Sequence, residues 1–207
     1  MTEAGSDGTL RRRILDATRH LLVAEGYTSL SMRKIARAIG CSPTAIYLYF
    51  QNKDALVHTL IDEGFGLLYE ELQEEAARHD DPVARLEALW RRYVAFGRSN
   101  PEYYEIMFML HPERMERYPP EKYRRARRCL EFSIQALEEG RRLGVFAVED
   151  PRVTASAAWA ALHGAIALLL ARRVDVRIDP EAFIDTIIRT LLRGVLAPEA
   201  LPQMAAK

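Results

Sequence analysis

Hydroxyl and cationic side chains gather in the segment from Ser31 to Lys53. Ser and Tyr hydroxyls and Arg and Lys cations are the groups with which proteins hold phosphate oxygens. The wider stretch from Thr9 to Lys53 contains eight basic and two acidic residues, whereas residues 54–81 contain one basic and nine acidic residues. Because Lys+Arg and Asp+Glu both number 29 in the whole chain, the net charge does not indicate what kind of partner the protein binds. The separation of charge instead predicts a polyanion bound by the N-terminal segment alone.

Patterns typical of catalysis or metal binding are missing from the sequence. The histidines accompany no Cys or Ser nucleophile motif, residues 111–113 lack the spacing of zinc ligands, and no glycine-rich phosphate loop occurs. We therefore expect no catalytic residues, no metal site and no cofactor. A helical enzyme of an uncharacterised kind stays open as an alternative.

Cysteine usage and apolar content bear on the cellular location. The two cysteines, Cys41 and Cys129, lie far apart in unlike contexts, which argues against a disulfide framework and favours a reducing compartment. The first ten residues lack the apolar core of a signal peptide. The longest apolar stretch, 157–171, contains His163 and is too short to span a bilayer. We expect a cytoplasmic protein with no membrane partner.

Two short helices predicted within SMRKIARAIGCSPTAIYLYF position the hydroxyl and cationic groups. Ile35, Ile39 and Ile46 are spaced to face a common core, and Gly40 lets the backbone reverse between the helices. Ser42 is placed to cap the second helix, and Pro43 to begin it. This arrangement predicts a helix-turn-helix whose second helix lies in the major groove of DNA.

The helix-turn-helix suggests which side chains touch DNA. Thr44, Ala45 and Leu48 can reach base edges, and the Tyr47 hydroxyl can bond a phosphate. Arg33 and Lys34 begin the preceding helix, and Asn52 with Lys53 offers the start of a fourth helix as a further anion site. The full predicted DNA-binding set is Ser31, Arg33, Lys34, Ser42, Pro43, Thr44, Ala45, Tyr47, Leu48, Tyr49 and Lys53.

The run from about Arg12 to Leu60 strongly resembles the DNA-binding domain of the TetR family of bacterial regulators. The resemblance rests on Ala17, Gly26-Tyr27, Ser31, Ile35-Ala36, Gly40-Cys41-Ser42, Tyr47, Tyr49-Phe50 and Lys53, with Cys41 in place of the usual Val. It implies that Ser31 and Arg33 touch phosphate, that residues 42–45 read bases, and that Tyr47, Tyr49 and Lys53 clamp the backbone. Tyr49 could instead serve mainly in packing.

The remaining sequence predicts long helices and no strands, so the expected fold class is all-α. The expected helices span 9–25, 31–38, 42–49, 53–79, 82–99, 101–110, 120–143, 151–173 and 180–197, and four of them follow an Asp-Pro or Asn-Pro pair. We expect a helix-turn-helix DNA-binding domain over 9–53 and a helical ligand-binding and dimerisation domain over 54–200. The segment WAALHG (159–164) also resembles the Trp…His-Gly signature of the WHG subgroup of the family.

The last two predicted helices are apolar around most of their circumference and therefore need cover on more than one side. A second subunit is the natural cover, forming a two-fold four-helix interface, and a homodimer would place two recognition helices on one palindromic operator. The expected interface residues are Ala161, Ala165, Leu168, Leu169, Phe183, Ile187, Ile188 and Leu191. A monomer that buries both helices by itself is the alternative.

Aromatic and methionine side chains gather in residues 100–113 and on the helices expected to face them. Such side chains adapt to varied apolar shapes, which suggests a pocket for an apolar or amphipathic small molecule. Its expected lining is Trp90, Tyr93, Phe96, Tyr103, Tyr104, Met107, Phe108, Phe132, Gln135, Trp159 and His163. The arginines among residues 124–128 could meet an anionic ligand group, such as the phosphates of an acyl-coenzyme A. A ligand-free core and a solvated basic face are the plainer alternatives.

Together these features predict a dimeric transcriptional regulator that binds double-stranded DNA and responds to a small effector. The family resemblance implies that it is a repressor, which the effector releases from DNA. A hydrophobic-ligand carrier with a vestigial helix-turn-helix is the alternative from another class of protein. The basic N-terminal segment argues against it, because a carrier needs no cations that face phosphates.

Overall fold

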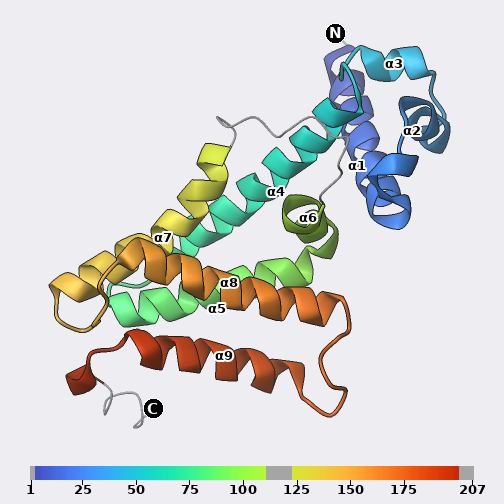
Figure 1. Ribbon diagram of the computed structural model, residues 1–207. Helices are drawn as coiled ribbons and strands as arrows, with labels where there is room; N and C mark the ends of the chain where they lie inside the picture. The colour runs from blue at the N-terminus through green and yellow to red at the C-terminus, as the bar shows by residue number, and fades with distance from the viewer. Residues whose placement is uncertain (1–2, 111–122, 201–207) are drawn as a thin grey trace. The chain divides into compact units, whose positions relative to one another are not determined.

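The computed structural model describes residues 3–110 and 123–200, which are almost entirely helical (Figure 1). The helices are α1 (Glu3–Ser29), α2 (Met32–Ile39), α3 (Pro43–Tyr47), α4 (Lys53–Ala76), α5 (Pro82–Ser99), α6 (Pro101–Tyr104), α7 (Tyr123–Arg142), α8 (Pro151–Leu170) and α9 (Pro180–Val195). A π-helix, η1 (Glu105–Met109), continues α6, and a 3₁₀ turn, η2 (Pro198–Ala200), follows α9. The predicted all-α class is confirmed.

The chain divides by packing into two units. Among the described residues, the first contains 3–66, 100–110 and 123, and the second contains 67–99 and 124–200. Helix α4 therefore begins in the first unit and ends in the second, while α6 and η1 belong to the first unit and pack on α1. The functional boundary expected at residues 53/54 stays a prediction, because packing alone does not test it.

Local sequence signals account for the ends of the N-terminal helices. The αL conformation of Gly40, with φ 69° and ψ 37°, ends α2. Gly26, with φ 76°, interrupts α1 close to the predicted end of the first helix. Helix α1 begins at Glu3 and not at residue 9, so it extends further towards the N-terminus than the expected 9–25.

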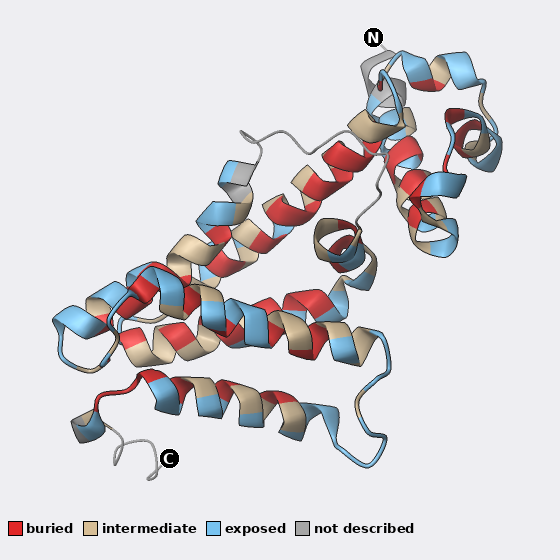
Figure 2. Ribbon diagram, viewed as in Figure 1, coloured by how far each residue is buried: buried red, intermediate tan, exposed pale blue. Residues whose placement is uncertain are grey.

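The core of the first unit lies between α1, α2 and the start of α4. Ile35 and Ile46 are fully buried, as their spacing predicts, whereas Ile39 is half-buried. Figure 2 shows the buried side of α4 continuing along most of this helix. The contacts of α6 and η1 with α1 fix this segment to the same unit.

In the second unit, α5, α8 and α9 pack against one another. Ion pairs between side chains also join α5 to α9: Arg91 to Asp185 at 2.6 Å and Arg98 to Glu181 at 2.6 Å. An isolated antiparallel bridge between Phe146 and Leu196 ties the segment after α7 to the end of α9.

Helix α8 is longer than the apolar stretch 157–171 suggests. Its 20 residues make it long and apolar enough, by length and composition, to cross a membrane, which corrects the expectation that this region is too short. Core helices of soluble proteins meet the same criterion. Only 28% of an apolar 18-residue window of this helix is buried within the chain, so much of its apolar surface is uncovered.

Candidate nucleic-acid interface

The α2–turn–α3 segment presents its polar side chains outward. Ser31 and Ser42 cap α2 and α3, with Oγ accepting from the backbone N–H groups of Lys34 (3.3 Å) and Ala45 (3.2 Å). A hydroxyl that accepts in this way keeps its own proton for donation to an outside acceptor, such as a phosphate oxygen. Capping and phosphate contact by the two serines are therefore compatible.

Helix α3 exposes one face and buries the other. Ile46 is fully buried and Phe50 is 5% exposed, whereas Tyr47 is 54% exposed and Leu48 is 80% exposed. Ser42, Pro43 and Thr44 are also exposed, and Ala45 and Tyr49 are half-buried. The residues expected to read bases therefore lie on an accessible surface. Tyr49 packs partly against the protein and is partly exposed to solvent.

Two of the three expected phosphate-binding cations have partners within the protein. Lys34 forms an ion pair with Glu25, and Lys53 donates from Nζ to the Tyr27 carbonyl oxygen at 3.3 Å. Arg33 is exposed. The Glu25 contact was not anticipated from sequence, because nine residues and a turn separate it from Lys34.

The start of α4 is already capped. Asn52 Oδ1 accepts from the Ala55 backbone N–H at 2.8 Å, so this N–H is not available to an anion while the cap is in place. The Tyr27 hydroxyl donates to Asp54, and burial together with this carboxylate raises the pKa of Tyr27. Asp54 thereby fixes Tyr27 beside Lys53.

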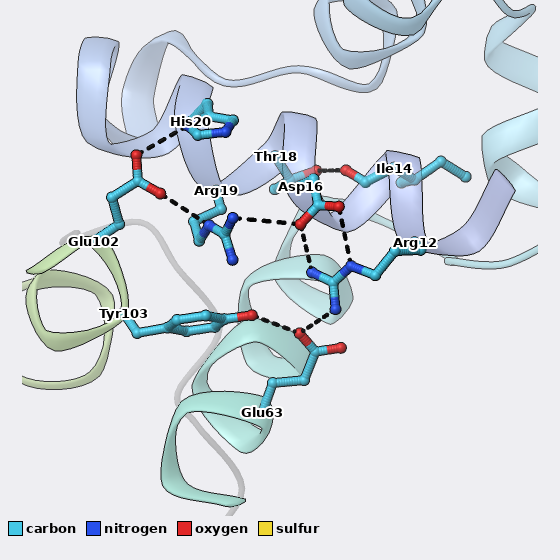
Figure 3. Close-up of polar contacts among 9 residues, drawn as sticks. All are labelled: Arg12, Ile14, Asp16, Thr18, Arg19, His20, Glu63, Glu102 and Tyr103. Carbon is cyan, nitrogen blue, oxygen red and sulfur yellow. Dashed lines mark hydrogen bonds and ion pairs between the residues drawn. The ribbon is translucent and has the colours of Figure 1, made fainter. Parts of the chain in front are cut away.

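A polar cluster joins α1, α4 and α6 within the first unit (Figure 3). Arg19 Nε donates to Glu102 Oε2 at 2.9 Å, and His20 Nδ1 lies 2.9 Å from Glu102 Oε1. Arg12 and the Tyr103 hydroxyl both donate to Glu63 Oε2, each at 3.0 Å. No sequence signal predicts these contacts, because they join residues 40 to 83 positions apart.

Charge within this cluster holds Arg12 in its protonated form. Its guanidinium donates to both oxygens of Asp16, at 3.1 and 2.8 Å, and to Glu63. The Asp16 hydrogen bonds and the further contacts with Tyr103 and Glu63 raise the pKa of Arg12, against the opposing effect of partial burial.

The residues expected to line an effector pocket divide between the two units. Tyr103, Tyr104, Met107 and Phe108 lie in the first unit, where Tyr104 is fully buried and its ring centroid is 4.8 Å from that of Phe108. The other seven lie in the second unit: Trp90, Tyr93, Phe96, Phe132, Gln135, Trp159 and His163. Trp90, Tyr93 and Phe96 are buried, and Gln135 is exposed.

The Trp159–His163 pair lies partly at the surface of the second unit. Trp159 is 38% exposed, and its Nε1–H donates to the Tyr93 hydroxyl at 2.9 Å. The His163 ring stacks on the Trp159 ring at a centroid distance of 5.6 Å. Burial lowers the pKa of His163, which favours the neutral imidazole.

The expected interface residues differ in how far their own protomer covers them. Ala165 and Ile188 are buried within the protomer and belong to its core. Leu168 is 45% exposed, and Ala161 is also exposed. The half-buried members are Leu169, Phe183, Ile187 and Leu191.

Family comparisons agree with the helix-turn-helix and extend to the second unit. Residues 14–60 match the family model described as bacterial regulatory proteins, tetR family. Residues 86–191 match the model described as Tetracyclin repressor-like, C-terminal domain, and this range includes the WAALHG segment. Within the described residues no group of three or more His, Cys, Asp or Glu side chains could hold a metal ion.

A curated relative, an uncharacterized HTH-type transcriptional regulator of Haemophilus influenzae, is 30% identical over 101 residues. The alignment covers 49% of this chain and 53% of the relative, so the chain spans about half of that regulator's length.

Two solved structures share the fold. A transcriptional regulator of the TetR/AcrR family from Thermobifida fusca is 26% identical, with a TM-score of 0.68 and 90% and 98% of the two chains covered. The transcriptional regulator FadR of Bacillus subtilis, in complex with stearoyl-CoA, is 18% identical, with a TM-score of 0.75 and 88% and 98% covered. With both family models matched in order along its length, this chain belongs to the TetR family of bacterial regulatory proteins.

Proposed function

We propose that the protein is a homodimeric transcriptional repressor that binds a palindromic DNA operator through α2 and α3. The observation that carries the proposal is the exposed row formed by Thr44 and Tyr47 of α3 and its C-cap Leu48, with the fully buried Ile46 on the opposite face. A helix that is anchored to the core by one face and exposed on the other can enter a major groove while the unit stays folded. Serine hydroxyls and cations flank this row, where phosphates would lie.

The uncovered apolar surface of α8 supports dimerisation. Only 28% of an apolar 18-residue window of α8 is buried in one chain, and Leu168 is 45% exposed. A second copy of the same helices would remove this surface from water in an isologous four-helix interface. Two-fold symmetry of the protein would then demand two-fold symmetry of the operator.

The proposed effector is an amphipathic thioester such as a long-chain acyl-coenzyme A, which releases the protein from DNA. FadR, which has the same fold, binds stearoyl-CoA. In this chain, Arg124, Arg127 and Arg128 are exposed at the start of α7, where they could pair with phosphates. Arg128 also lies over the Tyr69 ring at 4.4 Å, and Tyr69 is 5.3 Å from the Phe132 ring, so aromatic surface adjoins the cations.

Selection of fragments from the host's own genomic DNA tests operator binding. The full-length protein should retain fragments that share an inverted repeat, and sedimentation should give twice the 23.6 kDa chain mass. Failure to retain any duplex in dilute buffer would overturn the proposal and favour a hydrophobic-ligand carrier. A monomer at working concentrations would contradict the homodimer and, with it, the expected two-fold symmetry of the operator.

Calorimetry with stearoyl-CoA tests the effector. Saturable heat and release of a selected fragment are the expected results. The Arg124→Gln/Arg127→Gln double variant should bind stearoyl-CoA more weakly, whereas Arg142→Gln, which removes an exposed cation at the other end of α7, should bind normally. Absence of heat with acyl chains of every length would exclude this class of effector while leaving DNA binding untouched.

A further inference from the structure

We propose that Glu102 and Tyr103 on α6 are positioning residues for DNA binding, which make α6 a third support of the helix-turn-helix. The inference rests on the proposed DNA binding and assigns a function to side chains outside the 14–60 range that matches the DNA-binding family model. Neither residue needs to touch DNA, because each acts through side chains of α1 and α4.

Glu102 holds α1 through two neighbouring side chains. One carboxylate oxygen accepts from Arg19 and the other contacts His20, and since a carboxylate only accepts, the His20 Nδ1 must carry a proton in this contact. The Arg19 guanidinium also lies 4.8 Å from the Tyr103 ring centroid and 3.4 Å from Asp16. Arg19 is thereby confined on three sides, with 20% of its side chain exposed.

Tyr103 holds α4 and, through it, α1. Its hydroxyl shares Glu63 Oε2 with Arg12, so one carboxylate oxygen on α4 receives donors from both α6 and α1. Tyr103 is 8% exposed and the Glu63 side chain is 25% exposed. Isolated exposed ion pairs contribute little, but a partly buried network with shared acceptors is more strongly coupled.

Close apolar packing supports the polar contacts. A Cβ on Gly64 would lie 2.4 Å from Met107 Sδ and 3.3 Å from Tyr103 Cδ1, so the glycine lets α6 and η1 approach α4 closely. The Phe65 and Phe108 rings meet edge to face at 5.4 Å. The π-helical turn, a form often found at functional sites, sets Met107 and Phe108 against α4. This segment is therefore fixed to the unit along its length.

The contacts of Glu102 and Tyr103 with α1 and α4 affect DNA binding because α1 supports the helix-turn-helix formed by α2 and α3. Helix α1 packs on α2, and α2 packs on α3, so freedom gained by α1 is passed to the recognition helix. Any added freedom must be lost again when DNA binds, which weakens binding. Simple electrostatics predicts the opposite sign for Glu102→Gln, because the loss of a negative charge should favour a polyanion. The two explanations are therefore separable.

The test compares full-length variants on a duplex selected from the host's genomic DNA. Glu102→Gln and Tyr103→Phe should each weaken binding about five- to tenfold, at the lower end of the usual range of site-to-site coupling. Glu25→Gln is the matched control: it also removes one negative charge from the first unit, but it frees Lys34 and leaves α6 untouched. This control should bind more tightly.

A double-mutant cycle separates positioning from a general loss of stability. In an Arg19→Gln/His20→Gln background, Glu102→Gln should have almost no further effect on DNA affinity, because its two partners on α1 are gone. Hydrogen exchange of α1 amides should become faster in Glu102→Gln while the midpoint of thermal unfolding stays within a few degrees.

The outcomes are decisive in either direction. Unchanged or tighter binding by Glu102→Gln, or additive effects in the cycle, would overturn the inference. If the wild-type protein binds no duplex, the proposed function fails. Unchanged hydrogen exchange of α1 in the variants would separately refute the role of Glu102 and Tyr103 in holding α1.

Discussion

Lys53 lies over the ring of Tyr27, with its ammonium nitrogen 3.9 Å from the ring centroid, and it donates a hydrogen bond to the carbonyl oxygen of the same residue. Tyr27 is 5% exposed, and Asp54 accepts a hydrogen bond from its hydroxyl. Tyr27 therefore holds the cation at the first residue of α4. A cation–π contact of this kind contributes on the order of 0.5–1 kcal/mol and restricts a flexible side chain.

Replacement of Lys53 by alanine should weaken binding to every DNA sequence by a similar factor. A lysine that contacts phosphate displaces about one counterion, so the slope of log K against log salt should become shallower by about one. Filter binding or fluorescence anisotropy on selected and unrelated duplexes measures both quantities. Arg142→Ala, which removes a cation from the second unit, should leave both unchanged. A sequence-dependent loss would show that Lys53 reads bases.

Thr44→Ala should change which operator sequence is preferred. Thr44 is exposed on α3, and a side chain that contacts a base edge discriminates between bases by about 1–3 kcal/mol. A library randomised across each half-site should show relaxed preference at one position, with the salt slope retained. Tyr47→Phe, which loses the hydroxyl proposed to bond a phosphate, should instead weaken all sequences alike. An unaltered preference would remove Thr44 from the reading surface.

The starts of α8 and α9 were predictable from sequence because capping is local. Asp150 accepts from the Arg152 N–H and Asp179 from the Ala182 N–H, each at 2.8 Å, as their Asp-Pro pairs predict. Asn100 also precedes a helix at a Pro, but it forms no side-chain cap. Capping contacts join residues only a few positions apart, so they do not predict contacts between residues more than one helical turn apart.

Long-range partners were not predictable for the same reason. Glu63 and Glu102 read as ordinary acidic residues of a solvated helix face. They gain cationic partners only because α1 lies against α4, where Arg12 meets Glu63, and against α6, where Arg19 meets Glu102. The π-helical turn at Glu105–Met109 has no propensity signal either, and the expected helix 101–110 changes type within it. The residues predicted to read DNA lie on or next to one short, capped helix, so local signals were sufficient to predict their exposure, while their contact with DNA stays a prediction.

Acid should destabilise the protein partly through His163. Burial lowers the pKa of this imidazole below its ordinary value near 6.5, so the unfolded chain binds more protons than the folded one between those two values. Stability therefore rises with pH through this window and is lost as pH falls below about 6.5. His163→Gln should show a smaller difference in Tm between pH 7.5 and pH 5 than the wild type. An NMR titration midpoint for His163 at or above 6.5 would contradict the assignment.

Gly140→Ala should destabilise the second unit because a rigid ring fills the space beside Gly140. A Cβ there would lie 2.0 Å from Phe146 Cδ2 and 2.4 Å from Cε2, and Phe146 is 3% exposed. The ring cannot retreat easily, since hydrogen bonds from Ala147 to Val195 (2.9 Å) and from Ala197 to Val145 (3.0 Å) fix the backbone on both sides.

Overpacking of this kind costs about 1–3 kcal/mol, only partly offset by the roughly 1 kcal/mol that alanine gains over glycine in a helix. Urea unfolding should therefore show a clear loss of stability for Gly140→Ala. Gly8→Ala, whose added methyl group would meet nothing within 4 Å, should be neutral or slightly stabilising. Adding Phe146→Leu to Gly140→Ala should recover part of the loss, because a smaller and more flexible side chain makes room for the methyl group. If the two substitutions are simply additive, the clash with the ring is not the cause.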